Sequence, residues 1–189
     1  MRGFIAIQLP KEIKDILAGI QDDLKQAQAD VKWVKPQNIH LTLNFLGEID
    51  EDLTKKIQKI IDQIAGKNPC FSLCLNQLGA FPKLLTPRVI WINLTNEKPV
   101  LVIARELKMR LREIGLAQES RKFSTHITLG RVRSGLNQEA LIKKLELLNS
   151  NKAAGQTEFN VRSLTLFKST ITNSGPIYET IYEYLLASD

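Results

Sequence analysis

The amino-acid sequence predicts an α+β fold of two pseudo-symmetric lobes, each an antiparallel sheet with flanking helices, arranged around a central cleft. Two observations predict it. Long strand-like runs alternate with helical runs, and two successive passages share the order helix, strand, helix, strand. In each passage a strand carries the same His-x-Thr motif, at His40 and at His126, and nearly half of the chain separates the two motifs. An internal duplication would account for this repeat, and we expect residues 1–189 to form a single bilobal domain.

Strands and helices alternate through the first half of the chain. Apolar or alternating runs predict strands at residues 3–9, 38–46, 71–78 and 88–94. Apolar side chains at helical spacing predict helices at residues 11–29 and 51–65. The second helix should end at Gly66, with Pro69 soon after it. Residues 31–36 lead into the first motif strand, and residues 79–87 are expected to connect the last two strands.

The second half repeats this alternation. A helix is predicted from residue 99 or 100 to residue 114, closed by Gly115. The second motif strand follows at about residues 125–131, and a further helix is predicted at 139–148. The tail gives strands near residues 157–169 and 177–186.

Each motif places a histidine and a threonine two residues apart. The first reads His-Leu-Thr-Leu and contains His40 and Thr42; the second reads His-Ile-Thr-Leu and contains His126 and Thr128. Because successive side chains of a strand point to opposite faces, each His and Thr emerge side by side. A single histidine on an apolar strand is usually a packed residue, but a core has no reason to repeat the same polar pair. We therefore interpret both pairs as functional and suited to acid–base chemistry on an anionic group.

The charge balance is moderately basic. The chain carries 26 Lys and Arg against 20 Asp and Glu, a formal net charge of +6. This excess is compatible with a nucleic-acid or phosphate partner. Four of the cations flank the second motif, and we expect them to raise the local concentration of an anionic substrate. They are Arg121, Lys122, Arg131 and Arg133.

Composition also limits the compartment and the metal chemistry. No apolar run is as long as a membrane helix requires, and the N-terminal residues 1–10 read as a strand rather than a secretory signal. Cys70 and Cys74 are the only cysteines, which suits a reducing cytoplasm. On a strand they would lie roughly 13 Å apart, too far to share one zinc ion. We therefore expect a cytoplasmic protein with no metal site and no membrane association, and a monomer.

Five segments carry a resemblance to a known family. They are residues 2–7, 33–47, 123–131, 166–169 and 175–178, and the second and third contain the two motifs in full context. Together they resemble the two-histidine phosphoesterases, and in particular the RNA 2′,3′-cyclic phosphodiesterases, also called 2′-5′ RNA ligase-like proteins. The similarity extends over nearly the whole chain. One departure is Thr125, where many relatives have proline, and it leaves the His, Thr and Arg that follow it intact.

The resemblance implies a hydrolase, independent of metals and cofactors, that opens a 2′,3′-cyclic phosphate at an RNA end and leaves a 2′-phosphate. It implies that His40 donates a proton to the departing ribose oxygen and that His126 accepts a proton from the attacking water. Thr42, Thr128 and Arg131 would bind the non-bridging phosphate oxygens. The residues alone do not assign acid and base, because the two motifs are nearly symmetric.

Two other functions stay open at this point. The same histidines would serve the reverse reaction, ligation of RNA halves through a 2′-5′ linkage. A non-catalytic RNA- or nucleotide-binding module on the same fold is the second alternative, although it would have little reason to keep both His and both Thr. A generic phosphate-binding protein is disfavoured, because the chain has no glycine-rich phosphate loop.

Aromatic side chains are further candidates, because they stack on RNA bases. The candidates are Trp33, Phe45, Trp91 and Phe123. Phe45 stands five residues after His40 and would lie on the opposite face of a regular strand, so we expect it in the core. Phe123 could belong either to the core or to the site, and the sequence favours neither.

Overall fold

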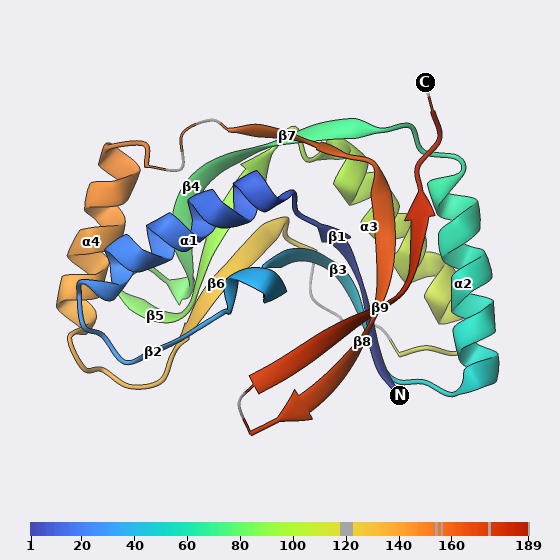
Figure 1. The fold of residues 1–189 in the computed structure, drawn as a ribbon, viewed down its shortest axis with the longest axis horizontal. Coiled ribbons are helices and arrows are strands. Elements are labelled where there is room, and N and C mark those ends of the chain that lie inside the picture. Colours follow the sequence, from blue (N-terminus) through green and yellow to red (C-terminus); the bar gives the residue numbers. More distant parts are fainter. Residues whose placement is uncertain (118–122, 154, 156, 174, 189) are drawn as a thin grey trace.

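The computed structural model describes residues 1–117, 123–153, 155, 157–173 and 175–188, which form two antiparallel sheets with helices packed against them (Figure 1). The first sheet has the order β3-β1-β8-β9, and its strands are β1 (Arg2–Gln8), β3 (His40–Glu48), β8 (Ser163–Thr172) and β9 (Gly175–Leu185). The second has the order β2-β6-β5-β4-β7, and its strands are β2 (Val31–Trp33), β4 (Phe71–Lys83), β5 (Thr86–Thr95), β6 (His126–Val132) and β7 (Glu158–Val161). The helices are α1 (Lys11–Lys25), α2 (Glu51–Ala65), α3 (Lys98–Glu113) and α4 (Gln138–Ser150), with a short 3₁₀ turn at Pro36–Asn38. The predicted α+β fold is confirmed.

The two sheets contain a structural repeat. In the first, β1 leads through α1 and the short β2 of the other sheet to β3, which pairs with β1 and is followed by α2. In the second, β5 leads through α3 to β6, which pairs with β5 and is followed by α4. Both motif strands therefore occupy equivalent places, each antiparallel to the strand that precedes its connecting helix.

Individual boundaries differ from the sequence prediction where the chain leaves one sheet for the other. The single strand expected at residues 157–169 is divided at Arg162, so that β7 joins the second sheet and β8 the first. The expected connection at residues 79–87 is largely strand, because β4 and β5 continue pairing until Lys83 meets Thr86. In contrast, α2 has the predicted bounds. Its first turn is capped by Asp50, whose side chain accepts a hydrogen bond from the Leu53 N–H at 2.8 Å.

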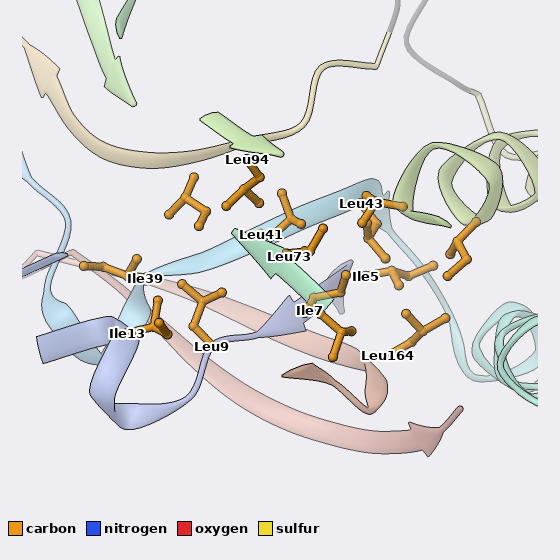
Figure 2. Packing of buried hydrophobic residues seen from close by; sticks show 14 of the residues in the cluster. Ile5, Ile7, Leu9, Ile13, Ile39, Leu41, Leu43, Leu73, Leu94 and Leu164 are labelled. Carbon is orange, nitrogen blue, oxygen red and sulfur yellow. The ribbon is translucent and has the colours of Figure 1, made fainter. Parts of the chain in front are cut away.

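One hydrophobic cluster joins the two sheets. Leu41 and Leu43 of β3 pack in the same cluster as Leu73 of β4 and Leu94 of β5 (Figure 2). The inward side chains of β6, Ile127 among them, belong to it as well. Because alternate residues of a strand point in opposite directions, burial of these aliphatic residues turns the His and Thr of each motif to the other face of its sheet.

In the second sheet the indole ring of Trp91 packs directly on Gly79, which holds the ring near the second motif. Gly79 faces Trp91 across β4 and β5, and a methyl group on Gly79 would overlap the indole. Trp91 in turn pairs with Thr128, and its ring centroid lies 6.5 Å from that of His126. Glycine at this position is therefore required by packing.

We expect Gly79→Ala to lower the free energy of unfolding by about 1–3 kcal/mol, because the added methyl must displace the indole. Gly19→Ala is the matched control. Gly19 lies exposed inside α1, with no atom within 4 Å of the added methyl, so this change should raise the free energy by about 0.5–1 kcal/mol. Equilibrium urea unfolding measures both. If the unfolding midpoint of Gly79→Ala equalled that of the wild-type protein, the indole would not cover Gly79.

Candidate active site

The two motif strands have the same register against their neighbours. His40 pairs with Gln8 at the end of β1, and His126 pairs with Asn93 near the end of β5. Two residues further on, each threonine is again paired. The register then shifts by one residue in both strands, leaving Leu43 of β3 and Leu129 of β6 with no residue opposite them in these pairings. Each motif strand therefore carries a β-bulge directly after its threonine.

The bulge decides which side chain joins the histidine and threonine. Beyond it, Phe45 pairs with Phe4 and Arg131 pairs with Val89. Phe4 lies on the face of His40, since their ring centroids are 4.9 Å apart. Residues five apart lie on opposite faces of a regular strand, so the extra residue returns Phe45, and likewise Arg131, to the face of the motif.

The expectation that Phe45 belongs to the core is wrong for this reason. Its side chain is 59% exposed, and its ring centroid lies 6.3 Å from that of Phe4. The other candidate aromatics divide differently. Trp33 and Phe123 pack against the main hydrophobic cluster, whereas Trp91 lies near His126.

His40 is held by a hydrogen bond on each ring nitrogen. Its Nδ1 lies 2.7 Å from the Asn38 carbonyl oxygen, and its Nε2 lies 2.8 Å from Thr42 Oγ1. A carbonyl only accepts, so Nδ1 carries a proton and Nε2 accepts from the Thr42 hydroxyl when the ring is neutral. Burial lowers the pKa of His40, the bond to Asn38 opposes this, and the nearby charge of Lys14 lowers the pKa further.

His126 is anchored in the same way in the other sheet. Its Nδ1 lies 2.7 Å from the Ser124 carbonyl oxygen, again the residue two positions before the histidine. Its ring stands edge-on to Phe81, with centroids 5.2 Å apart. Nδ1 is therefore the donor here as well, and Nε2 is the nitrogen that can exchange a proton with a substrate.

The two motif strands lie next to each other. Strands β3 and β6 contact each other although they belong to different sheets. Tyr178 of β9 lies next to His40, with ring centroids 5.4 Å apart. Burial raises the pKa of Tyr178, and the positive charges of Arg131 and Arg2 partly oppose this rise. An arginine of the second motif thus acts on a residue that contacts the histidine of the first.

Sequence reasoning missed Tyr178 and Lys14 as neighbours of His40. Tyr178 is in one of the segments that carried the resemblance, but nothing in its spacing connects it to the motif. Arg133 lies exposed beyond the end of β6, and Arg121 and Lys122 fall outside the described residues.

The described part of the chain has no group of three or more His, Cys, Asp or Glu placed to hold a metal ion. None of its helices is long and apolar enough to cross a membrane. A hollow along residues 135–143, at the start of α4, includes no residue of either motif.

Comparison with known proteins gives one consistent result. The family model described as LigT like Phosphoesterase matches residues 7–91 and again residues 92–178, as the internal repeat requires. The RNA 2′,3′-cyclic phosphodiesterase of Methanocaldococcus jannaschii is 35% identical over 97% of this chain and 100% of its own length. That of Methanothermobacter thermautotrophicus is 32% identical over 94% and 95%.

Solved structures agree with the fold. The crystal structure of LigT of E. coli complexed with 3′-AMP has a TM-score of 0.77 and 25% identity, covering 98% of this chain and 97% of that one. The crystal structure of TT0787 of Thermus thermophilus has a TM-score of 0.83 and 24% identity over the whole of both chains.

We expect His40 to titrate below its ordinary pKa of 6.5, because burial and Lys14 disfavour the imidazolium. Protonation then favours the unfolded chain, so this histidine opposes folding increasingly as the pH falls through 6.5. Proton NMR of the Hε1 resonances measures the pKa, and His126→Asn assigns the two signals. Lys14→Gln should raise the pKa of His40. A pKa of 6.5 or above in the wild-type protein would contradict this account.

Proposed function

Because the chain belongs to the LigT-like family of two-histidine phosphoesterases, we propose that it is an RNA 2′,3′-cyclic phosphodiesterase. The observation that carries the proposal is the matched pair of bulged strands. Each presents an imidazole Nε2 and a threonine hydroxyl on one face, and the two strands lie in contact with each other. Hydrolysis of a cyclic phosphodiester requires a base on one side of phosphorus and an acid on the other, which this pair supplies. We propose that the lobes act as a single bilobal unit.

In the proposed reaction His126 Nε2 accepts a proton from water while the water oxygen bonds to phosphorus. The bond from phosphorus to the ribose O3′ breaks, and His40 Nε2 donates a proton to O3′. The product carries a 2′-phosphate and a free 3′-hydroxyl, and the two histidines have exchanged protonation states. A solvent proton exchange restores them for the next turnover.

The remaining polar groups stabilise the charge on phosphorus. When His40 is neutral, the Thr42 hydroxyl donates to its Nε2. When His40 is protonated, Nε2 becomes a donor and Thr42 is free to donate to a non-bridging oxygen. Thr128 has the equivalent position on β6, and the Arg131 guanidinium adds a positive charge on the same face.

The lowered pKa of His40 places a condition on its role as the acid. In the free protein its neutral form is favoured, so the imidazolium must be stabilised by the substrate. A bound phosphodiester carries a negative charge, which raises the pKa of an adjacent histidine. We propose that substrate binding itself promotes the protonation of His40.

Phe45 extends the proposed site beyond the phosphate. It is an exposed aromatic ring on the face of His40 and Thr42, at the place that Arg131 occupies in the other motif. We propose that Phe45 stacks on the base of the terminal nucleotide, while Arg131 contacts the phosphate.

The direct test is incubation with an oligonucleotide ending in a 2′,3′-cyclic phosphate, in EDTA, with identification of the product phosphate. We expect a 2′-phosphate, and a bell-shaped dependence of kcat/KM on pH, because one histidine must be neutral while the other is protonated. His40→Ala or His126→Ala should lower the rate roughly 10²–10⁴-fold, and Thr42→Ala or Thr128→Ala about 10–10³-fold.

Thr86→Ala is the matched control, because Thr86 is an exposed threonine at the start of β5. It should leave the rate unchanged. Activity that is lost in EDTA and restored by a divalent ion would contradict the mechanism. Joined RNA halves as the main product would favour ligation, and near-normal turnover by folded His→Ala variants would favour a binding module.

For Phe45→Ala we expect kcat/KM to fall roughly 5–150-fold, because stacking on a base contributes about 1–3 kcal/mol. Phe45→Trp should keep most of the activity, since it keeps an aromatic face. Val102→Ala removes an equally exposed apolar side chain on α3 and serves as the control. Neither alanine variant should change stability by more than about 0.5 kcal/mol. An unchanged kcat/KM for Phe45→Ala would exclude stacking.

A further inference from the structure

A cavity of about 190 Å³ lies beside His40, at the end of β3 where the motif begins. His40 and Asn38 form part of its wall, and the other polar side chains that line it are Gln8, Lys14, Gln37, Tyr178 and Thr180. Thr42 and Phe45 do not line it. The cavity therefore adjoins the proposed reaction centre on the side away from the threonine and the proposed base stack.

The lining of this cavity favours an anion. It contains a lysine, amide and hydroxyl groups, and no Asp or Glu. Lys14 is half-buried, and its Nζ donates to the Gln37 carbonyl oxygen at 3.3 Å. Among the described residues it has no ion pair with a carboxylate. Burial lowers the pKa of Lys14, so this cation has lost part of its hydration without gaining a counter-charge.

The charge of Lys14 also disfavours the protonated form of His40, the proposed acid, unless an anion is bound nearby. This positive charge lowers the pKa of His40, which must be protonated to donate to the leaving oxygen. A phosphate in the cavity would neutralise Lys14 and remove this penalty.

The connectivity of a nucleotide indicates which phosphate can reach the cavity. In the proposed reaction His40 faces O3′, and C3′ is bonded to C4′, which carries C5′ and the phosphate on the 5′ side. O2′ is bonded to C2′, next to the carbon that carries the base. The 5′-side phosphate therefore leaves the ribose on the side of His40, and the base leaves it on the other side.

We propose that Lys14 and this cavity bind the phosphate on the 5′ side of the terminal nucleotide. This rests on the proposed function and deepens it, because it makes the end of an RNA chain, rather than a free nucleoside cyclic phosphate, the preferred substrate. Lys14 is then a specificity-determining residue that recognises charge and not base identity.

Binding of two product analogues tests the cavity without depending on turnover. Adenosine 2′-monophosphate lacks the 5′-phosphate, and adenosine 2′,5′-bisphosphate has it. By isothermal titration at low salt we expect the wild-type protein to bind the bisphosphate about tenfold more tightly. Lys14→Gln should remove most of this preference, and Lys14→Arg should keep it. Lys25→Gln, at the other end of α1 and already paired with Asp22, should leave it unchanged.

Turnover measurements then show whether the cavity recognises the 5′-side phosphate or the nucleoside that precedes it. The substrates are adenosine 2′,3′-cyclic phosphate and two ApA dinucleotides with the same cyclic end, one with a natural linkage and one with an uncharged methylphosphonate linkage. We expect kcat/KM to be about tenfold higher only for the natural dinucleotide, and Lys14→Gln to lower that ratio. Equal bisphosphate and monophosphate affinities in the wild-type protein would overturn the proposal, as would a preference that survives Lys14→Gln or the methylphosphonate. Loss of turnover on all three substrates, with the bisphosphate preference intact, would instead contradict the proposed function alone.

Discussion

The register of each motif strand against its neighbour is the constraint on which the candidate site depends. A one-residue bulge after each threonine leaves Leu43 of β3 and Leu129 of β6 without a residue opposite them. Without it, Phe45 and Arg131 would point into the hydrophobic cluster, where an arginine would have to be desolvated. With it, each strand presents three side chains on one face while its aliphatic residues stay buried. The same β-bulge thus keeps the aliphatic side chains in the core and directs the motif side chains to the candidate site.

The repeat gives the two motif strands equivalent backbones. Their side chains differ beyond the threonines, and the proposed substrate likewise has a base on one part and a phosphate on another. Both histidines are anchored through Nδ1 by the carbonyl two residues before them. Beyond the threonines, one strand has an exposed aromatic ring and the other a guanidinium, which suit a base and a phosphate. Lys14 adds a cation next to His40 on α1. Two related lobes can therefore hold the acid and the base of one reaction in different electrostatic surroundings.

Much of this was predictable from sequence, because hydrophobic period and capping are local signals. Helical spacing and Gly66 predicted the bounds of α2, and the duplicated motif identified the strands that carry the histidines. The bulges were not predictable, since a register shift depends on the partner strand and leaves no mark on the alternation of β3. Phe45 was misplaced for that reason. The contacts of Tyr178 and Lys14 with the site arise only when β9 and α1 pack beside His40.

In the proposed site both motifs bind one phosphate. With only two histidines in the chain, the proton NMR spectrum contains two Hε1 resonances, and titration with adenosine 2′-monophosphate reports on both at once. Both resonances should shift along one binding curve with a single Kd. A shift of only one resonance, or two curves with different Kd values, would contradict a shared site.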